Sequence, residues 1–228
     1  TVAIFSLEMG AESLVERIIC SHASINAGHL KTGKLTDEEY TQYFVATGVL
    51  AEAPIYIDDT PGIRVSEIRA KCRRLKQERN NLGLVVIDYL QLIEGNGKES
   101  RQQEVSEISR NLKKLAKELK VPVIALSQLS RGVEQRQDKR PIMSDIRESG
   151  SIEQDADIVA FLYRDDYYRQ EPDENGHVPE VEPNSTIEVI IEKNRSGPRG
   201  TVELNFMKEF NKFTNLVPDE IEQRAPMA

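Results

Sequence analysis

The sequence of 228 residues has no long apolar run. No stretch approaches the roughly 20 consecutive apolar residues that cross a bilayer. The first ten residues lack the basic start and long apolar segment of a signal peptide. These absences argue against a membrane partner and against secretion. The opening TVAIFSLEMG has the pattern of a buried strand, so we expect the chain to begin inside a larger protein.

Cysteine and histidine are also scarce. The two cysteines, Cys20 and Cys72, lie in helical patterns without a partner motif, so we expect no disulfide framework and a reducing, cytoplasmic compartment. The three histidines show no metal-ligand spacing. The sequence therefore predicts neither a disulfide scaffold nor a histidine metal centre.

The net charge of −8 disfavours a surface that is basic throughout. The acidic excess is concentrated between Asp165 and Ser185, where seven acids stand against one base, and the rest of the chain carries only −2. A protein that threads a nucleic-acid strand through a channel needs basic groups at the channel and not over its exterior. The charge therefore leaves nucleic-acid binding open.

Short β-branched runs alternate with longer helical periods, which is typical of an α/β fold with a mostly parallel sheet and flanking helices. Capping boxes are expected at Thr36 with Glu39 and at Ser100 with Gln103. Without a repeat or linker, the pattern favours one domain over residues 1–216 and a tail over 217–228. The expected strands are 2–6, 55–57, 84–88, 121–127, 158–163 and an antiparallel C-terminal hairpin of 186–192 and 201–207, and the expected helices are 11–27, 36–51, 66–80 and 101–120.

The segment Gly28–Leu35 (GHLKTGKL) fits the spacing G-x-x-x-x-G-K of a phosphate-binding loop. Such a loop must follow a strand and open a helix, so that backbone N–H groups face the phosphates, and a Ser or Thr must follow the lysine to hold Mg²⁺. Here the segment follows a helical pattern, and Leu35 stands at the hydroxyl position. We interpret it as a glycine-bearing turn between two helices.

Three predicted strands lead into polar residues: Asp88 closes LVVID, Glu8 follows VAIFS, and Gln128 follows VPVIALS. A carboxylate after a buried strand has the form of a Walker B strand, which anchors Mg²⁺ or its waters. Ligands of open α/β sheets bind outside the carboxyl ends of the strands. We therefore expect these three side chains to converge on one crevice.

Five segments together resemble the successive motifs of the DnaB family of bacterial replicative helicases: FSLEM, VVIDYLQLI, PVIALSQLSR, SDIRESGSIEQDADIV and EVIIEKNRSGPRGTV. They follow the family's order from Ile4 to Val202, and the acidic segment and the tail lie outside the match. The resemblance implies a RecA-like P-loop NTPase fold and an ATP-dependent DNA helicase that moves 5′ to 3′. It also implies ATP and Mg²⁺ as cofactors, single-stranded DNA, a helicase loader and primase as partners, and action at the replication fork.

The resemblance also implies roles for the residues at the strand ends. Glu8 is expected to be the base that polarises the attacking water, and Asp88 the carboxylate that holds Mg²⁺. Gln128 is expected to sense the γ-phosphate and to report hydrolysis to the loop that follows it. Arg17, on the helix after Glu8, resembles a nucleotide contact of the family.

Lys193 and Arg195 match the pair that reaches into the neighbouring subunit's site in this family, and Asn194 between them is expected to contact nucleotide. An arginine finger that acts in trans requires a ring or filament of like subunits, here a homohexamer. Without the resemblance, Lys193 and Arg195 would be interpreted as a solvated charge pair on a hairpin.

The resemblance places Arg147, Glu148 and Gly150 at the central channel, where they would hold the backbone of single-stranded DNA. An arginine and glycine N–H groups suit phosphate oxygens and carry no base information. Glu148 would orient Arg147 or accept through its own backbone. Arg101, before the long helix, is a candidate for a second channel loop.

The strand, phosphate loop and first helix that the family places before Val2 are not in the sequence. We therefore expect this chain alone to bind ATP poorly and not to hydrolyse it. Two alternatives stay open: a RecA-like recombinase ATPase, because fold alone does not fix function, and a non-catalytic interaction module for a loader or primase. The segment SDIRESGSIEQ favours the helicase over the recombinase.

Overall fold

The computed structural model describes residues 1–95, 97, 100–146, 151–168 and 182–216. The chain divides into two compact units. The first unit consists of Thr1–Val15 with Glu52–Val159, and the second of Glu16–Ala51 with Ala160–Ala228. The assignment of residues 1–216 to a single domain stays a prediction, and the tail 217–228 lies outside the described residues.

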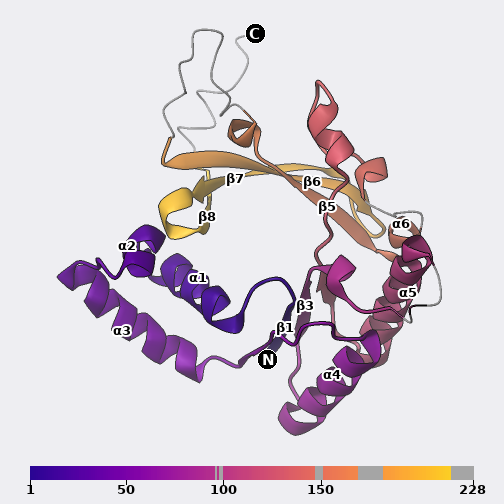
Figure 1. The fold of residues 1–228 in the computed structure, drawn as a ribbon, viewed down its shortest axis with the longest axis horizontal. Coiled ribbons are helices and arrows are strands. Elements are labelled where there is room, and N and C mark those ends of the chain that lie inside the picture. Colours follow the sequence, from indigo (N-terminus) through magenta and orange to yellow (C-terminus); the bar gives the residue numbers. More distant parts are fainter. Residues whose placement is uncertain (96, 98–99, 147–150, 169–181, 217–228) are drawn as a thin grey trace. The chain divides into compact units, whose positions relative to one another are not determined.

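The first unit is built on a parallel sheet in the order β2-β1-β3-β4, and Figure 1 labels its two central strands, β1 and β3. In β1, Val2 pairs with Ile55 on one side and Leu84 on the other. β1 and β3 have the bounds that the sequence predicts, whereas β4 is shorter than expected. The strands are β1 (Val2–Ser6), β2 (Ile55–Asp58), β3 (Leu84–Asp88) and β4 (Val123–Ala125).

Two helices, α4 (Val65–Arg79) and α5 (Arg101–Leu119), pack against alternate residues of these strands and against each other. Burial of a Val, Leu or Ile side chain contributes about 1.5–3 kcal/mol. The opposite side of the strands is less covered, and Ile124 there is 48% exposed. The core of the unit contains Ala3, Phe5, Ile68, Cys72, Val85, Ile87, Val105, Ile108, Leu112, Leu115 and Leu119.

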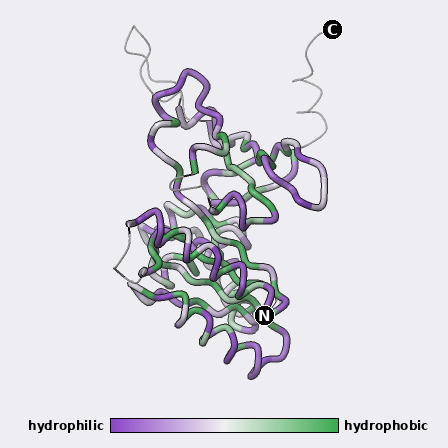
Figure 2. The backbone as a smooth tube through the Cα atoms, turned by 90° about the vertical axis from the view of Figure 1, so that its right-hand side faces the viewer, coloured by the Kyte–Doolittle hydropathy of each residue, from purple (hydrophilic) through white to green (hydrophobic). Residues whose placement is uncertain are grey.

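The spacing of the buried residues on α5 follows the helical period, and Figure 2 shows the resulting alternation of hydrophobic and hydrophilic residues along the helices. The predicted capping box at its start is confirmed: the Ser100 N–H donates to Oε1 of Gln103 over 3.0 Å. Short elements complete the unit: η1 (Leu90–Leu92), η2 (Arg131–Gln135), η3 (Met143–Asp145) and α6 (Ile152–Asp155).

The second unit contains a four-stranded sheet in the order β5-β6-β7-β8. The predicted antiparallel hairpin is confirmed, with Ile187 opposite Leu204, and the sequence did not predict β8. The strands are β5 (Ile158–Tyr163), which begins in the first unit, β6 (Asn184–Asn194), β7 (Gly200–Met207) and, after η5 (Lys208–Phe210), β8 (Lys212–Asn215).

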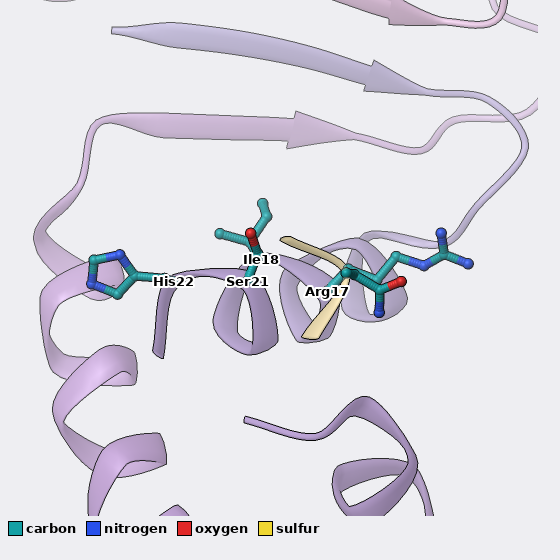
Figure 3. Close-up of a pocket in the computed structure, with 5 residues that line it drawn as sticks. Arg17, Ile18, Ser21 and His22 are labelled. Atoms are coloured by element: carbon teal, nitrogen blue, oxygen red, sulfur yellow. The ribbon is translucent and has the colours of Figure 1, made fainter. Parts of the chain in front are cut away.

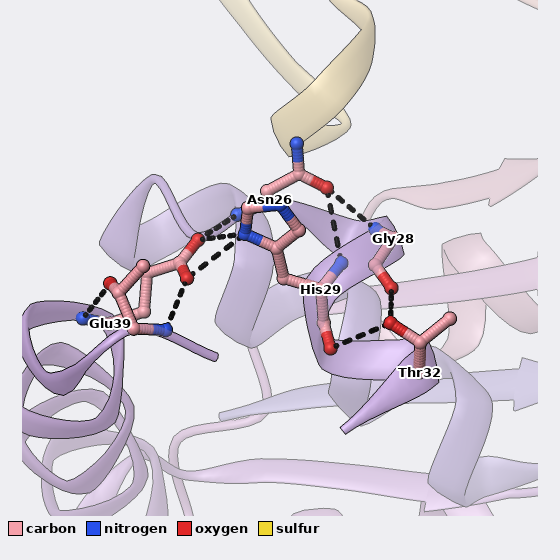
Figure 4. A network of polar contacts seen from close by, with 6 residues as sticks. Asn26, Gly28, His29, Thr32 and Glu39 are labelled. Atoms are coloured by element: carbon pink, nitrogen blue, oxygen red, sulfur yellow. Dashed lines mark hydrogen bonds and ion pairs between the residues drawn. The ribbon is translucent and has the colours of Figure 1, made fainter. Parts of the chain in front are cut away.

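The helix expected over 11–27 is wrong at its end. Helix α1 (Ala11–Ala23) stops because Ser24 has a left-handed backbone with φ of 56°. The expected turn at 28–35 is also partly wrong, since α2 (Ala27–Thr32) occupies most of it. The side chain of Asn26 starts α2 by accepting from Gly28 N at 2.8 Å and from His29 N at 3.2 Å (Figure 4).

Helix α2 ends at Gly33, whose φ of 67° suits glycine. The next helix, α3 (Asp37–Glu52), begins at the predicted capping box, in which Thr36 N donates to Glu39 over 2.8 Å. The G-x-x-x-x-G-K segment therefore follows a helix and not a strand, so it lacks the context that a phosphate loop requires. A helix with the length and apolar sequence needed to span a membrane is not found in the described part of the chain.

Candidate functional site

The carboxyl ends of β1, β3 and β4 lie at one edge of the first sheet, because all three strands are parallel and adjacent. Ser6 stands opposite Asp88 across the β1–β3 ladder, and Glu8 follows Ser6 by two residues. Gln128 follows the last paired residue of β4, Ala125, by three. The structure therefore brings the three predicted strand-end residues to one sheet edge, and their chemical roles stay predictions.

Hydrogen bonds fix the turn that carries Glu8. Leu7 N donates to the Asp88 carbonyl over 2.7 Å, and the hydroxyl of Ser6, which is 2% exposed, donates to the Met9 carbonyl over 2.7 Å. The Glu8 side chain itself is exposed. A backbone held by β3 thus presents a solvent-accessible carboxylate beside the end of the neighbouring strand.

Asp88 is half-buried at the end of β3, and its peptide bond to Tyr89 is cis. The described residues contain no group of three or more His, Cys, Asp or Glu side chains able to hold a metal ion. Mg²⁺ bound with nucleotide needs only one or two carboxylates, because waters and phosphates complete its shell. Asp88 therefore fits such an ion as a single ligand and not as part of a closed protein site.

Gln91, which is not among the site residues predicted from the sequence, holds the backbone of Gln128. The amide oxygen of Gln91, on η1, accepts from Gln128 N at 3.2 Å. The amide nitrogen of Gln91 donates to Ser127 Oγ over 2.9 Å and to the Gln128 carbonyl over 3.4 Å. The side chain of Gln128 is exposed at the sheet edge.

Arg101 begins α5 and is half-buried. Its guanidinium donates to Glu104 over 2.9 Å and also to the carbonyl of Gln91. The hydrogen bond from Arg101 lowers the pKa of Glu104, and the Gly97 N–H lowers it further. Arg101, a predicted DNA contact, is thus tied to the segment that follows Asp88.

The loop after Gln128 is closed by a second network. Arg136 donates to both carboxylate oxygens of Asp145, over 2.9 and 2.7 Å, and Asp145 is only 7% exposed. Ser130 N donates to the Asp145 carbonyl over 2.7 Å, and Leu129 bridges Ile146 in antiparallel fashion. Residues 129–130 therefore lie beside residues 145–146 at the base of this loop.

Arg147, Glu148 and Gly150 lie outside the described residues, so their predicted contact with DNA stays a prediction. The sequence has five bases between Gln128 and Gly150. One of them, Arg136, is paired with Asp145 in the structure. The sequence carries no signal for this pair beyond the presence of both charges.

In the second unit, Arg17 lines an open pocket with three neighbours on one face of α1 and with Asn211 from the η5–β8 turn (Figure 3). The side chain of Arg17 is exposed. The lining also includes Ile18, Ser21 and His22. A guanidinium, a hydroxyl and an imidazole on successive turns are suited to a polar or anionic group.

Three hairpin residues predicted to act at a nucleotide lie where β6 ends and the β6–β7 turn begins: Lys193, Asn194 and Arg195. Asn194 shapes the turn: its amide nitrogen donates to the Pro198 carbonyl over 3.1 Å, and its amide oxygen accepts from Ser196 N at 3.3 Å. Lys193 is half-buried and Arg195 is exposed. Asn194 therefore has a structural role in addition to its predicted nucleotide contact.

Proteins of one family are similar to this chain over almost its whole length. The family model described as DnaB-like helicase C terminal domain matches residues 1–215. The chain is 67% identical over 218 residues to the replicative DNA helicase DnaC of Bacillus subtilis (strain 168), covering 95% of this chain and 46% of that protein. The chain therefore spans about half the length of this curated relative.

Two solved structures are similar over 95% of the chain. One is a DnaB-like replicative helicase described with its interactions with primase, at 47% identity, a TM-score of 0.86 and 51% of that chain. The other is an ATPase domain, at 47% identity, a TM-score of 0.85 and 75% of that chain. Both likenesses cover the two units described above.

Proposed function

The chain belongs to the family of DnaB-like helicase C-terminal domains, and we propose that it is the ATP-driven motor of a homohexameric replicative helicase. Its RecA-like fold is that of the family. In this proposal the ring encircles one strand of DNA, moves along it and excludes the other strand. The protein would act in the cytoplasm at the replication fork, with primase and a helicase loader as partners in the primosome.

The observation that carries the proposal is the common sheet edge of Glu8, Asp88 and Gln128. We assign Glu8 to orienting and deprotonating the attacking water, since its carboxylate is exposed on a fixed turn. We assign Asp88 to holding Mg²⁺ and Gln128 to the γ-phosphate. Bound Mg–ATP would supply the phosphoryl group and the charge neutralisation that its transfer requires.

The remaining assignments depend on assembly. We propose that Lys193 and Arg195 act on the nucleotide of the neighbouring subunit, with Asn194 at the same turn, and that Arg17 contacts nucleotide. An arginine finger in trans can raise turnover by about 10³- to 10⁵-fold. Arg101 is assigned to a channel loop, together with the predicted DNA contacts 147, 148 and 150.

The test is ATP turnover, with and without single-stranded DNA, on this chain joined to the strand, phosphate loop and first helix that the family supplies. We expect DNA-stimulated turnover that Arg195→Ala abolishes while nucleotide binding survives. Arg199→Ala is the matched control, because it removes the same charge from the same turn at an exposed position.

Three results would contradict the proposal. Absence of turnover in the assembled ring would favour a non-catalytic interaction module for a loader or primase. Equal loss in Arg195→Ala and Arg199→Ala would show that the finger is wrongly assigned. Turnover stimulated by single-stranded DNA but without unwinding of a forked duplex would favour the recombinase alternative.

A further inference from the structure

The regular pairing of β4 ends before the chain reaches Gln128. The last ladder pair is Ile87 with Ala125. Beyond it, Leu126 N donates to the Ile87 carbonyl and Leu90 N donates to the Leu126 carbonyl, both over 2.9 Å. Past Leu126 the chain of β3 has already turned into η1, so β3 offers no further backbone partner to Gln128.

Gln91 supplies the missing partner with its side chain. A primary amide carries one acceptor and two donors, the same groups that a neighbouring strand would present. Gln91 uses them on both backbone groups of Gln128, accepting from N at 3.2 Å and donating to the carbonyl at 3.4 Å. The bond to Ser127 Oγ, at 2.9 Å, fixes the orientation of the amide.

The same residue is held from its other side. The Gln91 carbonyl accepts from the guanidinium of Arg101, which is paired with Glu104. Oε1 of Glu104 in turn accepts from Gly97 N at 3.0 Å. A continuous line of hydrogen bonds therefore runs from the backbone of Gln128 through Gln91 to the first turn of α5.

We propose that Gln91 is a positioning residue that sets the place of Gln128 at the γ-phosphate and links that place to Arg101 at the start of α5. This inference rests on the proposed function. Gln91 does not touch the reacting atoms. It holds the Gln128 backbone, so that the exposed Gln128 side chain is presented in one position, and it transmits a displacement of that backbone to the first turn of α5.

The variant that tests the inference is Gln91→Met in the assembled, phosphate-loop-containing ring. Methionine keeps the length and volume of glutamine and removes both hydrogen-bonding groups. Because a misplacement of about 1 Å can cost roughly 100-fold in rate, we expect kcat with DNA to fall about 10- to 100-fold. We expect KM for ATP to change by less than about twofold, since other residues bind the nucleotide.

Two companion variants separate positioning from general damage. Gln77→Met makes the same chemical change at an exposed position of α4 and is expected to leave turnover unchanged. Ser127→Ala removes only the bond that orients the amide and is expected to lower kcat less than Gln91→Met. If Gln91→Met does not fold, the kcat of Ser127→Ala still tests the inference.

Hydrogen exchange of the Gln128 amide gives a readout that does not depend on turnover. Loss of the bond to Gln91 should speed exchange of this amide about fivefold, with little change at amides within β3. The same experiment on Gln77→Met should show no acceleration.

The possible outcomes distinguish the two proposals. If the unsubstituted ring has no DNA-stimulated turnover, the proposed function fails. If it has such turnover and loses it in Arg195→Ala, but Gln91→Met keeps the kcat, the DNA stimulation and the slow Gln128 exchange, then the positioning role of Gln91 is overturned while the helicase function stands. A KM increase without a kcat loss would equally overturn it.

Discussion

Asp145→Ala is the substitution whose effect on stability the structure determines most directly. Asp145 is 7% exposed and accepts three N–H bonds: two from Arg136, at 2.9 and 2.7 Å, and one from Ile142 N at 2.8 Å. Removing the carboxylate leaves the Ile142 N–H without this acceptor and the guanidinium without its counter-charge. Both effects destabilise the native loop and not the unfolded chain.

The magnitude follows from these contacts. Removing one partner of a fully buried ion pair costs about 3–5 kcal/mol. The Arg136 side chain is 33% exposed and keeps its bond to the Arg140 carbonyl at 2.8 Å, so water relieves part of this cost. We therefore expect about 3 kcal/mol in total, including the lost bond from Ile142 N to a charged acceptor. For a chain of this size that corresponds to a decrease of roughly 6 to 12 °C in Tm.

The assay is urea unfolding of four proteins: unsubstituted, Asp145→Ala, Arg136→Ala and the double variant. The two sites should couple by about 1–3 kcal/mol, because they form one network. Asp138→Ala, whose carboxylate is in the same loop but 75% exposed, is the control and should change stability by less than about 1 kcal/mol. A loss in Asp145→Ala no larger than in the control, or additive single variants, would refute the reasoning.

Three further predictions concern the second unit and the thiols. The pKa of Glu39 is lowered to about 2, chiefly by the Thr36 N–H and then by His29 and Asn26. The pKa of Glu39 is lower in the folded chain than in the unfolded chain, so the stability that this carboxylate contributes is present above the unfolded value of about 4.3 and is lost as pH falls toward 2. Urea unfolding of Glu39→Gln should therefore show a weaker pH dependence in this window. Burial raises the pKa of Cys72 to about 12 and also raises that of Cys20, so a disulfide reagent at about pH 8 should modify neither thiol until urea unfolds the chain. Gly33→Ala should cost about 1 kcal/mol in thermal unfolding, because the φ of 67° strains any residue with a Cβ.

The parts of the fold that the sequence predicts best are those in which local pattern and burial agree. The bounds of β1, β3 and β5 follow from short β-branched runs, and the start of α5 follows from the Ser100 capping box. The helix at 11–27 is wrong at its end because Ser24 is left-handed, and the one local signal for a new helix start is Asn26, which caps α2.

The candidate site likewise has residues that the sequence predicts and residues that it does not. Glu8, Asp88 and Gln128 could be placed together because parallel strands bring their carboxyl ends to one edge. Gln91 could not be found, because it lies in an apolar motif and its partner is 37 residues away. The sequence does not distinguish Arg136 from the other bases between Gln128 and Gly150, and only the structure shows that it pairs with Asp145. Spacing predicts which strand a residue ends, and it does not predict which distant polar group that residue binds.

The two networks have one consequence when they are considered together. Gln91 holds the backbone of Gln128, and the bridge between Leu129 and Ile146 begins at the very next residue. A displacement of Gln128 would therefore reach Arg101 by one route and Ile146, the residue before Arg147, by the other. Energetic coupling between sites can be carried by packed side chains and hydrogen-bond networks of this kind. We therefore expect a change in the position of Gln128 to be felt at Arg101 and at Ile146 together rather than in turn.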